Sequence, residues 1–303
     1  MRLAYLILAH NTPRHLRRLI RALKSPDAAF LIHVDGRSDI EPFRCGGFDH
    51  NVAFLENRFD VYWDDFSKVD ATIRLIRHAV NQYRDPDYLV LLSGCDYPLR
   101  SPGYIENFFR KNQGHQFMNS VPLPCDALGK PLARLEHYWL PTPYRSQFVV
   151  RAVARLNAVN NRLELVTRDY ARVFKGLRPF GGSTWWALTR QACQYILSFI
   201  DSRPEIVTFF RNTYMPDESF FQTIIGNSAF SADRVRNLTF ADWSRPNGGP
   251  AMIDMDHLKM FTGSDRIVAD DGYGKGELLF ARKFGDNDSE LTKLIDEQLI
   301  RRG

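Results

Sequence analysis

Two aspartates stand just after apolar segments of the kind that form buried strands. Asp35 follows residues 29–34, and Asp96 follows residues 88–92 after a three-residue turn. An acid at the carboxyl end of a parallel strand is well placed to hydrogen-bond the ribose or base of a nucleotide. On local grounds Asp35 could equally be a turn residue before Gly36. The pattern therefore indicates either a nucleotide site or turn chemistry.

A third candidate is the tripeptide Pro216-Asp217-Glu218. With Pro216 at the first helical position, Glu218 falls at the third, where the helix dipole favours an ionised carboxylate. An ionised carboxylate can serve as a general base. It can also simply cap its own helix, and the tripeptide taken alone favours this second interpretation.

The elements that must carry these residues alternate along the first hundred positions. Strands are expected at 3–9, 29–34, 52–55 and 88–92, and helices after Thr12-Pro13 and over 66–83. This alternation predicts an α/β fold with a mostly parallel, Rossmann-like sheet flanked by helices. A chain of 303 residues with 44% hydrophobic content can bury a large core, which excludes a disordered polymer.

The basic charge of the chain is concentrated in one stretch. Arg145 to Arg178 holds eight Lys or Arg and two acids, whereas the whole chain carries only +5. Apolar residues interleave these cations, so the stretch could be a basic amphipathic helix on an anionic membrane. It could also pack on the core and leave its arginines solvated. No RNP-like, zinc-finger or helix-turn-helix signature accompanies the charge, so no nucleic-acid partner is expected.

The cysteines and the apolar segments indicate the cellular compartment of the protein. Cys45, Cys95, Cys125 and Cys193 are far apart and form no CxxC pair, so neither a zinc site nor a disulfide framework is implied. No apolar stretch reaches the roughly 20 residues that span a bilayer. We expect a cytoplasmic protein, attached peripherally to the inner face of the membrane if the basic stretch binds lipid.

Seven short segments together carry a family resemblance. They are residues 4–7 with His10, 33–35, 63 with 66–72, 91–99, 182–186, 216–223 and 280–284. In this order they resemble the core-2/I-branching glycosyltransferases, a family that includes the peptide xylosyltransferases. The resemblance implies a single GT-A-type domain over 1–303, with a nucleotide-binding half at 1–120 and an acceptor-binding and catalytic half at 121–303.

The resemblance also implies an activity. It is an inverting transfer of GlcNAc or xylose from a UDP-sugar to a hydroxyl of a glycan or lipid-linked acceptor, giving a β linkage without a metal cofactor. Two alternatives stay open: a protein that binds a nucleotide sugar without turning it over, and a basic nucleic-acid-binding protein.

Several residues receive roles from the resemblance. Glu218 is the expected base and Lys283 the expected phosphate-binding cation. The other donor-binding residues are Asp35, Asp96, Ser183, Lys259 and Arg282, and the acceptor-binding residues are Trp185, Glu136 and Asp217. Lys259 is the expected second cation, in a segment where Leu258 departs from the family pattern; Arg266 or Arg282 could substitute.

The acids of the chain agree with the metal independence that the resemblance implies. Metal-dependent GT-A enzymes place an Asp-x-Asp motif at the end of a central strand, where it holds Mg²⁺ or Mn²⁺. Here that position offers Asp96 alone. Asp254-Met255-Asp256 matches the Asp-x-Asp motif, but no strand is expected before it, and we interpret the two aspartates as a solvated surface pair.

Overall fold

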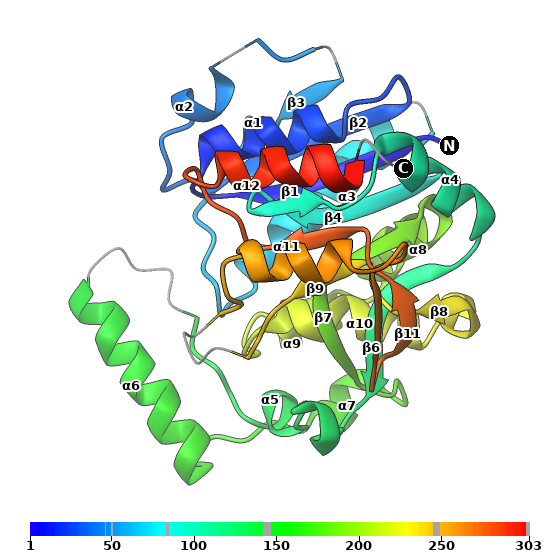
Figure 1. Ribbon diagram of the computed structural model, residues 1–303. Helices are drawn as coiled ribbons and strands as arrows, with labels where there is room; N and C mark the ends of the chain where they lie inside the picture. Colours follow the sequence, from blue (N-terminus) through cyan, green and yellow to red (C-terminus); the bar gives the residue numbers. More distant parts are fainter. Residues whose placement is uncertain (46, 50, 83–84, 142–146, 245–248, 301–303) are drawn as a thin grey trace.

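The structure is a computed structural model that describes residues 1–45, 47–49, 51–82, 85–141, 147–244 and 249–300. Its centre is a seven-stranded sheet (Figure 1). In spatial order the strands are β3 (Val52–Phe54), β2 (Ala28–Val34), β1 (Leu3–Ala9), β4 (Tyr88–Ser93), β7 (Phe180–Thr189), β6 (Gln116–Pro122) and β8 (Arg234–Val235). The first four are mutually parallel, and β7 runs antiparallel to both β4 and β6.

Helices bury both faces of the sheet, and alternate residues of each strand point to opposite faces. Tyr5 and Ile7 pack on one side with α1 (Pro13–Ala22), α4 (Pro102–Lys111), α11 (Met255–Thr262) and α12 (Ser289–Ile295). Ala4 and Leu6 pack on the other side with α3 (Ser67–Gln82), α8 (Arg190–Ser202), α9 (Pro204–Phe210) and α10 (Phe220–Gly226). This confirms the expected α/β class with helices on both faces.

Smaller elements lie beside the main sheet. A three-stranded sheet joins β5 (Asp96–Pro98), β12 (Phe280–Arg282) and β9 (Thr239–Ala241), and β10 (Val268–Asp271) pairs with β11 (Gly274–Glu277) as a hairpin. The short helical segments are α2 (Glu41–Arg44), η1 (Asp126–Leu128), α5 (Ala133–Glu136), α7 (Tyr170–Phe174), η2 (Pro216–Glu218), η3 (Ala229–Asp233) and a closing π-helical turn (Asp296–Ile300). The central sheet takes strands from both sides of residue 120.

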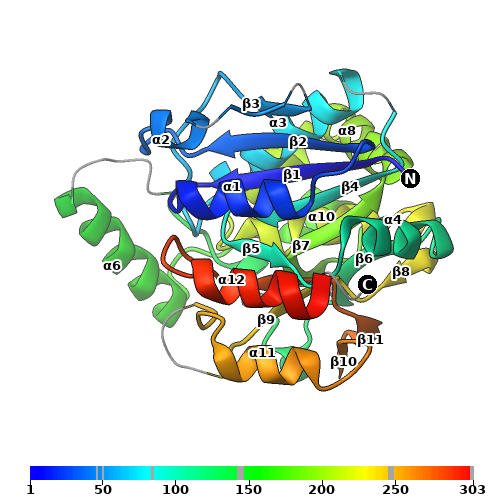
Figure 2. The same cartoon turned by 45° about the horizontal axis from the view of Figure 1, so that its top comes forward.

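Helix α6 (Gln147–Leu163) stands apart from the body of the molecule in both views (Figures 1 and 2). The basic stretch is therefore not one continuous helix, since α6 and α7 are separate elements and Phe174 of α7 is buried in the core. Arg145 lies outside the described residues. No helix in the described part of the chain is both long and apolar enough to cross a membrane.

Candidate active site

A cavity of about 670 Å³ lies where β1, β2 and β4 end, with β7 and β12 contributing to its wall. Its cationic lining residues are Arg37, Lys68, Lys130, Arg236, Arg282 and Lys283, and its carboxylates are Asp35, Glu218 and Asp271. A concave surface with more cations than acids concentrates anionic ligands. The lining therefore suits a phosphorylated ligand.

Asp35 is held at the cavity wall by its own turn. Its backbone N–H donates to the carbonyl of Ala9 at 2.8 Å, which ties the end of β2 to the end of β1. Its carboxylate accepts from the backbone and the guanidinium of Arg37, at 2.9 and 2.7 Å. Burial raises the pKa of Asp35, but the hydrogen bonds from Arg37 outweigh burial and the net shift is downward. The carboxylate is thus ionised at neutral pH.

Strand register brings Asp96 against Arg282. The two residues are partners in the antiparallel pair of β5 and β12, and Oδ1 of Asp96 lies 3.2 Å from Nε of Arg282. The guanidinium also sits over the ring of Trp185, 4.2 Å from its centroid. Burial raises the pKa of Asp96 to about 6, against the opposing charge of Arg282. Asp96 is fully buried and does not line the cavity, so it positions Arg282 instead of facing a ligand.

Lys283, the next residue, also lines the cavity. Its backbone is fixed by two hydrogen bonds, one from the N–H of Ile253 and one to the carbonyl of Ala251. Among the residues that the structure describes, its ammonium has neither a hydrogen-bond acceptor nor an ion-pair partner. Its charge is therefore available to a ligand.

Glu218 presents one carboxylate oxygen to two cations. Nζ of Lys130 and Nη1 of Arg134 each lie 2.7 Å from Oε2. Oε1 has no partner within the described part of the chain, and the residue lines the cavity. The side chain is 15% exposed, so the two contacts hold it with little competition from water. This orients Glu218 with one oxygen left to accept a proton.

The helix that was expected to begin at Pro216 is divided in two. Residues Pro216–Glu218 form the 3₁₀ turn η2, and α10 begins only at Phe220. The expectation that Glu218 occupies the third position of a longer helix is thus wrong, because Ser219 leaves helical geometry between the two segments. Neither capping nor the dipole of α10 orients its carboxylate; Lys130 and Arg134 do.

Asp217 turns away from the cavity. Its Oδ2 accepts hydrogen bonds from the hydroxyl of Thr184 and, at 2.7 Å, from the ammonium of Lys68. The side chain is only 3% exposed, so it is a buried link between β7, α3 and η2 and does not face an acceptor. Because removing one partner of a buried pair leaves an uncompensated charge, loss of Lys68 or Asp217 alone should destabilise the turn that carries Glu218.

A glycine allows β6 and β7 to close tightly beneath the cavity. A Cβ atom on Gly182 would lie 1.7 Å from the carbonyl oxygen of Asn119, where the register of the two strands shifts. Beyond this point Ser183 and Trp185 line the cavity, whereas Trp186 is buried in the core. The two indoles therefore point to opposite sides of the strand, as alternation requires.

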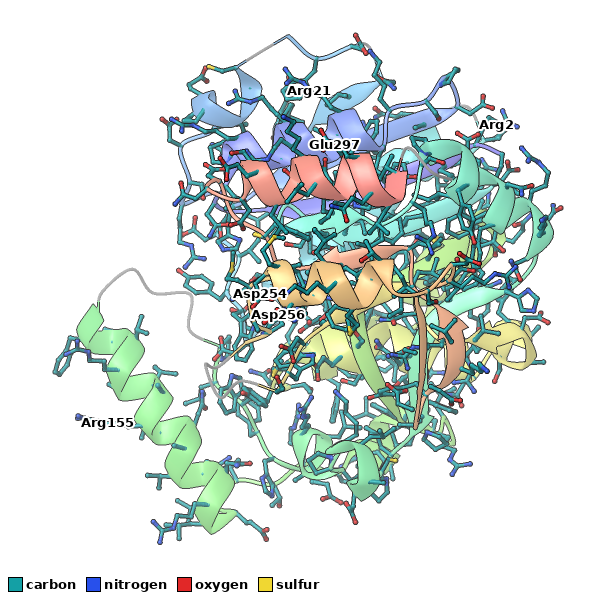
Figure 3. The ribbon with its side chains drawn as sticks, in the orientation of Figure 1. Arg2, Arg21, Arg155, Asp254, Asp256 and Glu297 are labelled. Carbon is teal, nitrogen blue, oxygen red and sulfur yellow. The ribbon has the colours of Figure 1, made fainter. Side chains whose placement is uncertain are left out.

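Besides Asp96 and Asp217, two further expected site residues are absent from the cavity lining. Lys259 on α11 is 74% exposed and pairs with Asp256 at 2.9 Å, and Glu136 on α5 is not part of the cavity lining. Figure 3 shows Asp254 and Asp256 at the start of α11, where Asp254 caps the helix. Arg266 is also outside, so Arg282 is the second cation that the fold brings to Lys283.

Several residues in or beside the cavity had no role assigned from the sequence. Lys130 and Arg134, which hold Glu218, lie in the irregular connection between β6 and α6, whose prolines mark it as a binding loop without singling out a residue. Lys68 belongs to a segment of the family resemblance. Tyr273 follows β10, and burial, together with the charge of Glu218, raises its pKa to about 12. No group of three or more His, Cys, Asp or Glu within the described ranges could hold a metal ion.

The fold and cavity together define an α/β protein with a cation-rich ligand site at the carboxyl ends of its strands. The family model of the Core-2/I-Branching enzyme matches residues 3–262. The chain therefore belongs to this family, which confirms the resemblance. Six of the seven segments lie within the matched range, and residues 280–284 lie beyond it.

Individual relatives agree with the family assignment. Xylosyltransferase 1 and xylosyltransferase 2 of Homo sapiens are 26% identical over 255 residues and 28% identical over 256 residues. The xylosyltransferase of Ciona intestinalis is 24% identical over 254 residues. Each match covers 82% of this chain and 24–28% of the relative, so the chain spans about a quarter of the length of these proteins.

A solved structure was also compared with the whole chain. A galactosyltransferase, LgtC, in complex with donor and acceptor sugar analogues, aligns with 97% of this chain and 96% of its own, with a TM-score of 0.35 and 11% identity.

Proposed function

We propose that the protein is an inverting glycosyltransferase that moves GlcNAc or xylose from a UDP-sugar to a hydroxyl of a glycan or lipid-linked saccharide, without a divalent metal. The observation that carries the proposal is that the Glu218 carboxylate and the Lys283 ammonium line the same cavity. Inverting transfer needs a base on one side of the anomeric carbon and positive charge on the other.

The reaction is a single displacement. Oε1 of Glu218 takes the proton of the acceptor hydroxyl while the hydroxyl oxygen forms a bond to the anomeric carbon. The bond from that carbon to the β-phosphate oxygen breaks, and its electron pair leaves with UDP. Attack from the face opposite the leaving group turns an α-linked donor into a β-linked product.

Lys283 and Arg282 are assigned to the diphosphate. Their cationic nitrogens are suitable donors to phosphate oxygens, whose charge grows as the bond breaks. The ion pair with Asp96 and the stacking on Trp185 fix Arg282 in advance, so little reorganisation accompanies the reaction. Asp35, at the end of β2, is assigned to the nucleoside. Ser183 and Trp185 are assigned to the sugar.

Replacing Glu218 by Gln tests the base. We expect turnover to fall by about 10²–10⁴-fold, with UDP affinity changed by less than about threefold. The matched control is Glu136→Gln, which removes the same charge outside the cavity and should leave turnover unchanged. Isothermal titration with UDP and a coupled UDP-release assay measure the two quantities. Unchanged turnover in E218Q would overturn the assignment, and donor binding by the unmodified protein without turnover would favour a non-catalytic sugar-nucleotide-binding protein.

The donor and the metal requirement are tested together. Melting temperature is measured with UDP-GlcNAc or UDP-xylose, each with and without EDTA, because a ligand that binds only the folded state raises it. We expect one of the two donors to give the larger shift and EDTA to leave that shift unchanged. A shift abolished by EDTA and restored by Mn²⁺ would contradict metal independence.

A further inference from the structure

Helix α6 carries an unusual share of the apolar surface of the molecule. Among the described residues thirteen large hydrophobic side chains are exposed, and six of them lie in or just after α6: Phe148, Leu156, Val159, Leu163, Leu165 and Val166. Phe148 is 81% exposed. Soluble proteins seldom concentrate apolar side chains in this way unless the surface meets another apolar phase.

The charges of α6 are arranged beside this apolar stripe. At 3.6 residues per turn, Arg151, Arg155 and Arg162 fall within an arc of about 40° on the helix, and the exposed apolar residues of the helix fill the next arc of about 80°. The helix contains no Asp or Glu. In Figure 3 Arg155 points away from the body of the molecule. One face of α6 is therefore both apolar and uniformly cationic.

The opposite face of α6 is fixed to the protein. The side chain of Asn157, which is 2% exposed, makes two hydrogen bonds of 2.9 Å with the backbone of Leu140. The Asn160 amide donates to the carbonyl of Tyr138 at 2.9 Å. These contacts set the rotation of the helix, so the side that carries the arginines and Phe148 must face outward.

We propose that α6 binds the surface of an anionic lipid membrane. The apolar stripe would enter the boundary between headgroups and acyl chains, and the arginines beside it would contact the anionic headgroups. A second copy of the chain is a poorer occupant of this face. Pairing two identical faces across a twofold axis would bring arginines together with no acid on either helix to compensate them.

The position of α6 gives the proposal a consequence for the cavity. β1 starts near the N-terminus and runs toward the side of the molecule on which α6 stands, in both views (Figures 1 and 2). The cavity lies at the carboxyl ends of β1, β2 and β4, on this same side. If the function proposed above holds, membrane attachment through α6 would bring the cavity near acceptors carried on lipid.

Vesicle flotation tests the surface. We expect the full chain to float with vesicles of phosphatidylcholine mixed with phosphatidylglycerol, to float poorly with phosphatidylcholine alone, and to detach as salt rises. The triple variant R151Q/R155Q/R162Q should lower the partition coefficient about a hundredfold. The double variant F148S/L156S should lower it at least about tenfold. These side chains are exposed, so both variants should keep the melting temperature of the unmodified protein.

Matched controls separate this proposal from general basicity and from catalysis. The variant R21Q/R44Q/R110Q removes three exposed arginines elsewhere and should bind vesicles within about twofold of the unmodified protein. E218Q should also bind normally, so a failure of the proposed chemistry would leave this result intact. Equal losses in both arginine triples, salt-insensitive binding to neutral vesicles, or a self-association that F148S/L156S abolishes without any vesicle binding would each overturn the proposal.

Discussion

Replacing Lys283 by Met removes a cavity cation that has no carboxylate partner among the residues the structure describes. Each of the other five cations lining the cavity has a carboxylate partner; the pairs are Arg37–Asp35, Lys68–Asp217, Lys130–Glu218, Arg236–Asp271 and Arg282–Asp96. Lys283 has none among the described residues. A bound diphosphate therefore meets its full charge, and Met removes that charge while keeping a side chain of similar length.

The expected loss follows from the strength of a hydrogen bond to a charged group. Such a bond contributes about 1.5–3 kcal/mol, which corresponds to a UDP affinity lowered by about 10- to 150-fold at 1.4 kcal/mol per tenfold. Since no carboxylate in the described structure depends on Lys283, the free energy of unfolding should change by less than about 0.5 kcal/mol. In this variant the UDP affinity should therefore fall while the free energy of unfolding stays nearly unchanged.

Isothermal titration with UDP at two salt concentrations measures the effect, and two lysine variants are its controls. Lys259→Met removes an exposed ammonium already paired with Asp256 and should leave the Kd unchanged. Lys68→Met removes the ammonium that pairs with the buried Asp217 carboxylate and should lower the melting temperature more than K283M does. If K283M binds UDP within twofold of the unmodified protein, or K259M loses as much affinity as K283M, the diphosphate site has been misplaced.

Two further predictions concern stability. Gly182→Ala should destabilise the fold by more than about 3 kcal/mol in urea unfolding, because its Cβ would meet a backbone oxygen. As a control, Gly103→Ala in the first turn of α4 should stabilise the fold by about 0.5–1 kcal/mol. Similar stability of the two variants would refute the close contact between β6 and β7. Burial lowers the pKa of His33 from 6.5 to about 4 in the folded protein. Between these two pH values the unfolded chain binds a proton that the folded protein does not, so the free energy of unfolding should fall as the pH drops from 6.5 toward 4. H33N should reduce the loss of stability between pH 7 and 5 by about 1–2 kcal/mol, and an unchanged slope would contradict this.

The elements most accessible from the sequence were those with strong local patterns. Residues 3–9 and 88–92 are continuous apolar runs, and β1 and β4 occupy these positions at the centre of the sheet. The division between η2 and α10 could not be read from the same kind of signal. Pro216 is a good first residue for a helix, but Asp217 bonds to Thr184 and Lys68, and this tertiary link accompanies a short turn that ends before Phe220.

At the site, the sequence allowed us to predict which residues take part, through the segments of the family resemblance. It did not allow us to predict which residues contact one another. Asp35, Glu218 and Lys283 reach one cavity from segments far apart in the chain. Asp96 was expected to face the donor, yet strand register pairs it with Arg282, a relation that depends on the pairing of β5 with β12. Lys259 was inferred from the likeness of residues 257–259 to a family segment, and the helix that carries it directs its ammonium to Asp256 instead.

Ion pairing explains how this cavity can be rich in cations and still well ordered. Unpaired, the six cationic side chains would repel one another and move; paired, five of them are held in fixed positions, which is the condition for electrostatic stabilisation without reorganisation. Asp217 and Glu218 have different roles although they are adjacent in the chain. Asp217 faces the interior and fixes Lys68, whereas Glu218 faces the cavity and uses one oxygen to bind two cations, leaving the other oxygen for chemistry. In the mechanism proposed above, Lys283, which has no partner among the described residues, would supply the charge that a departing diphosphate requires.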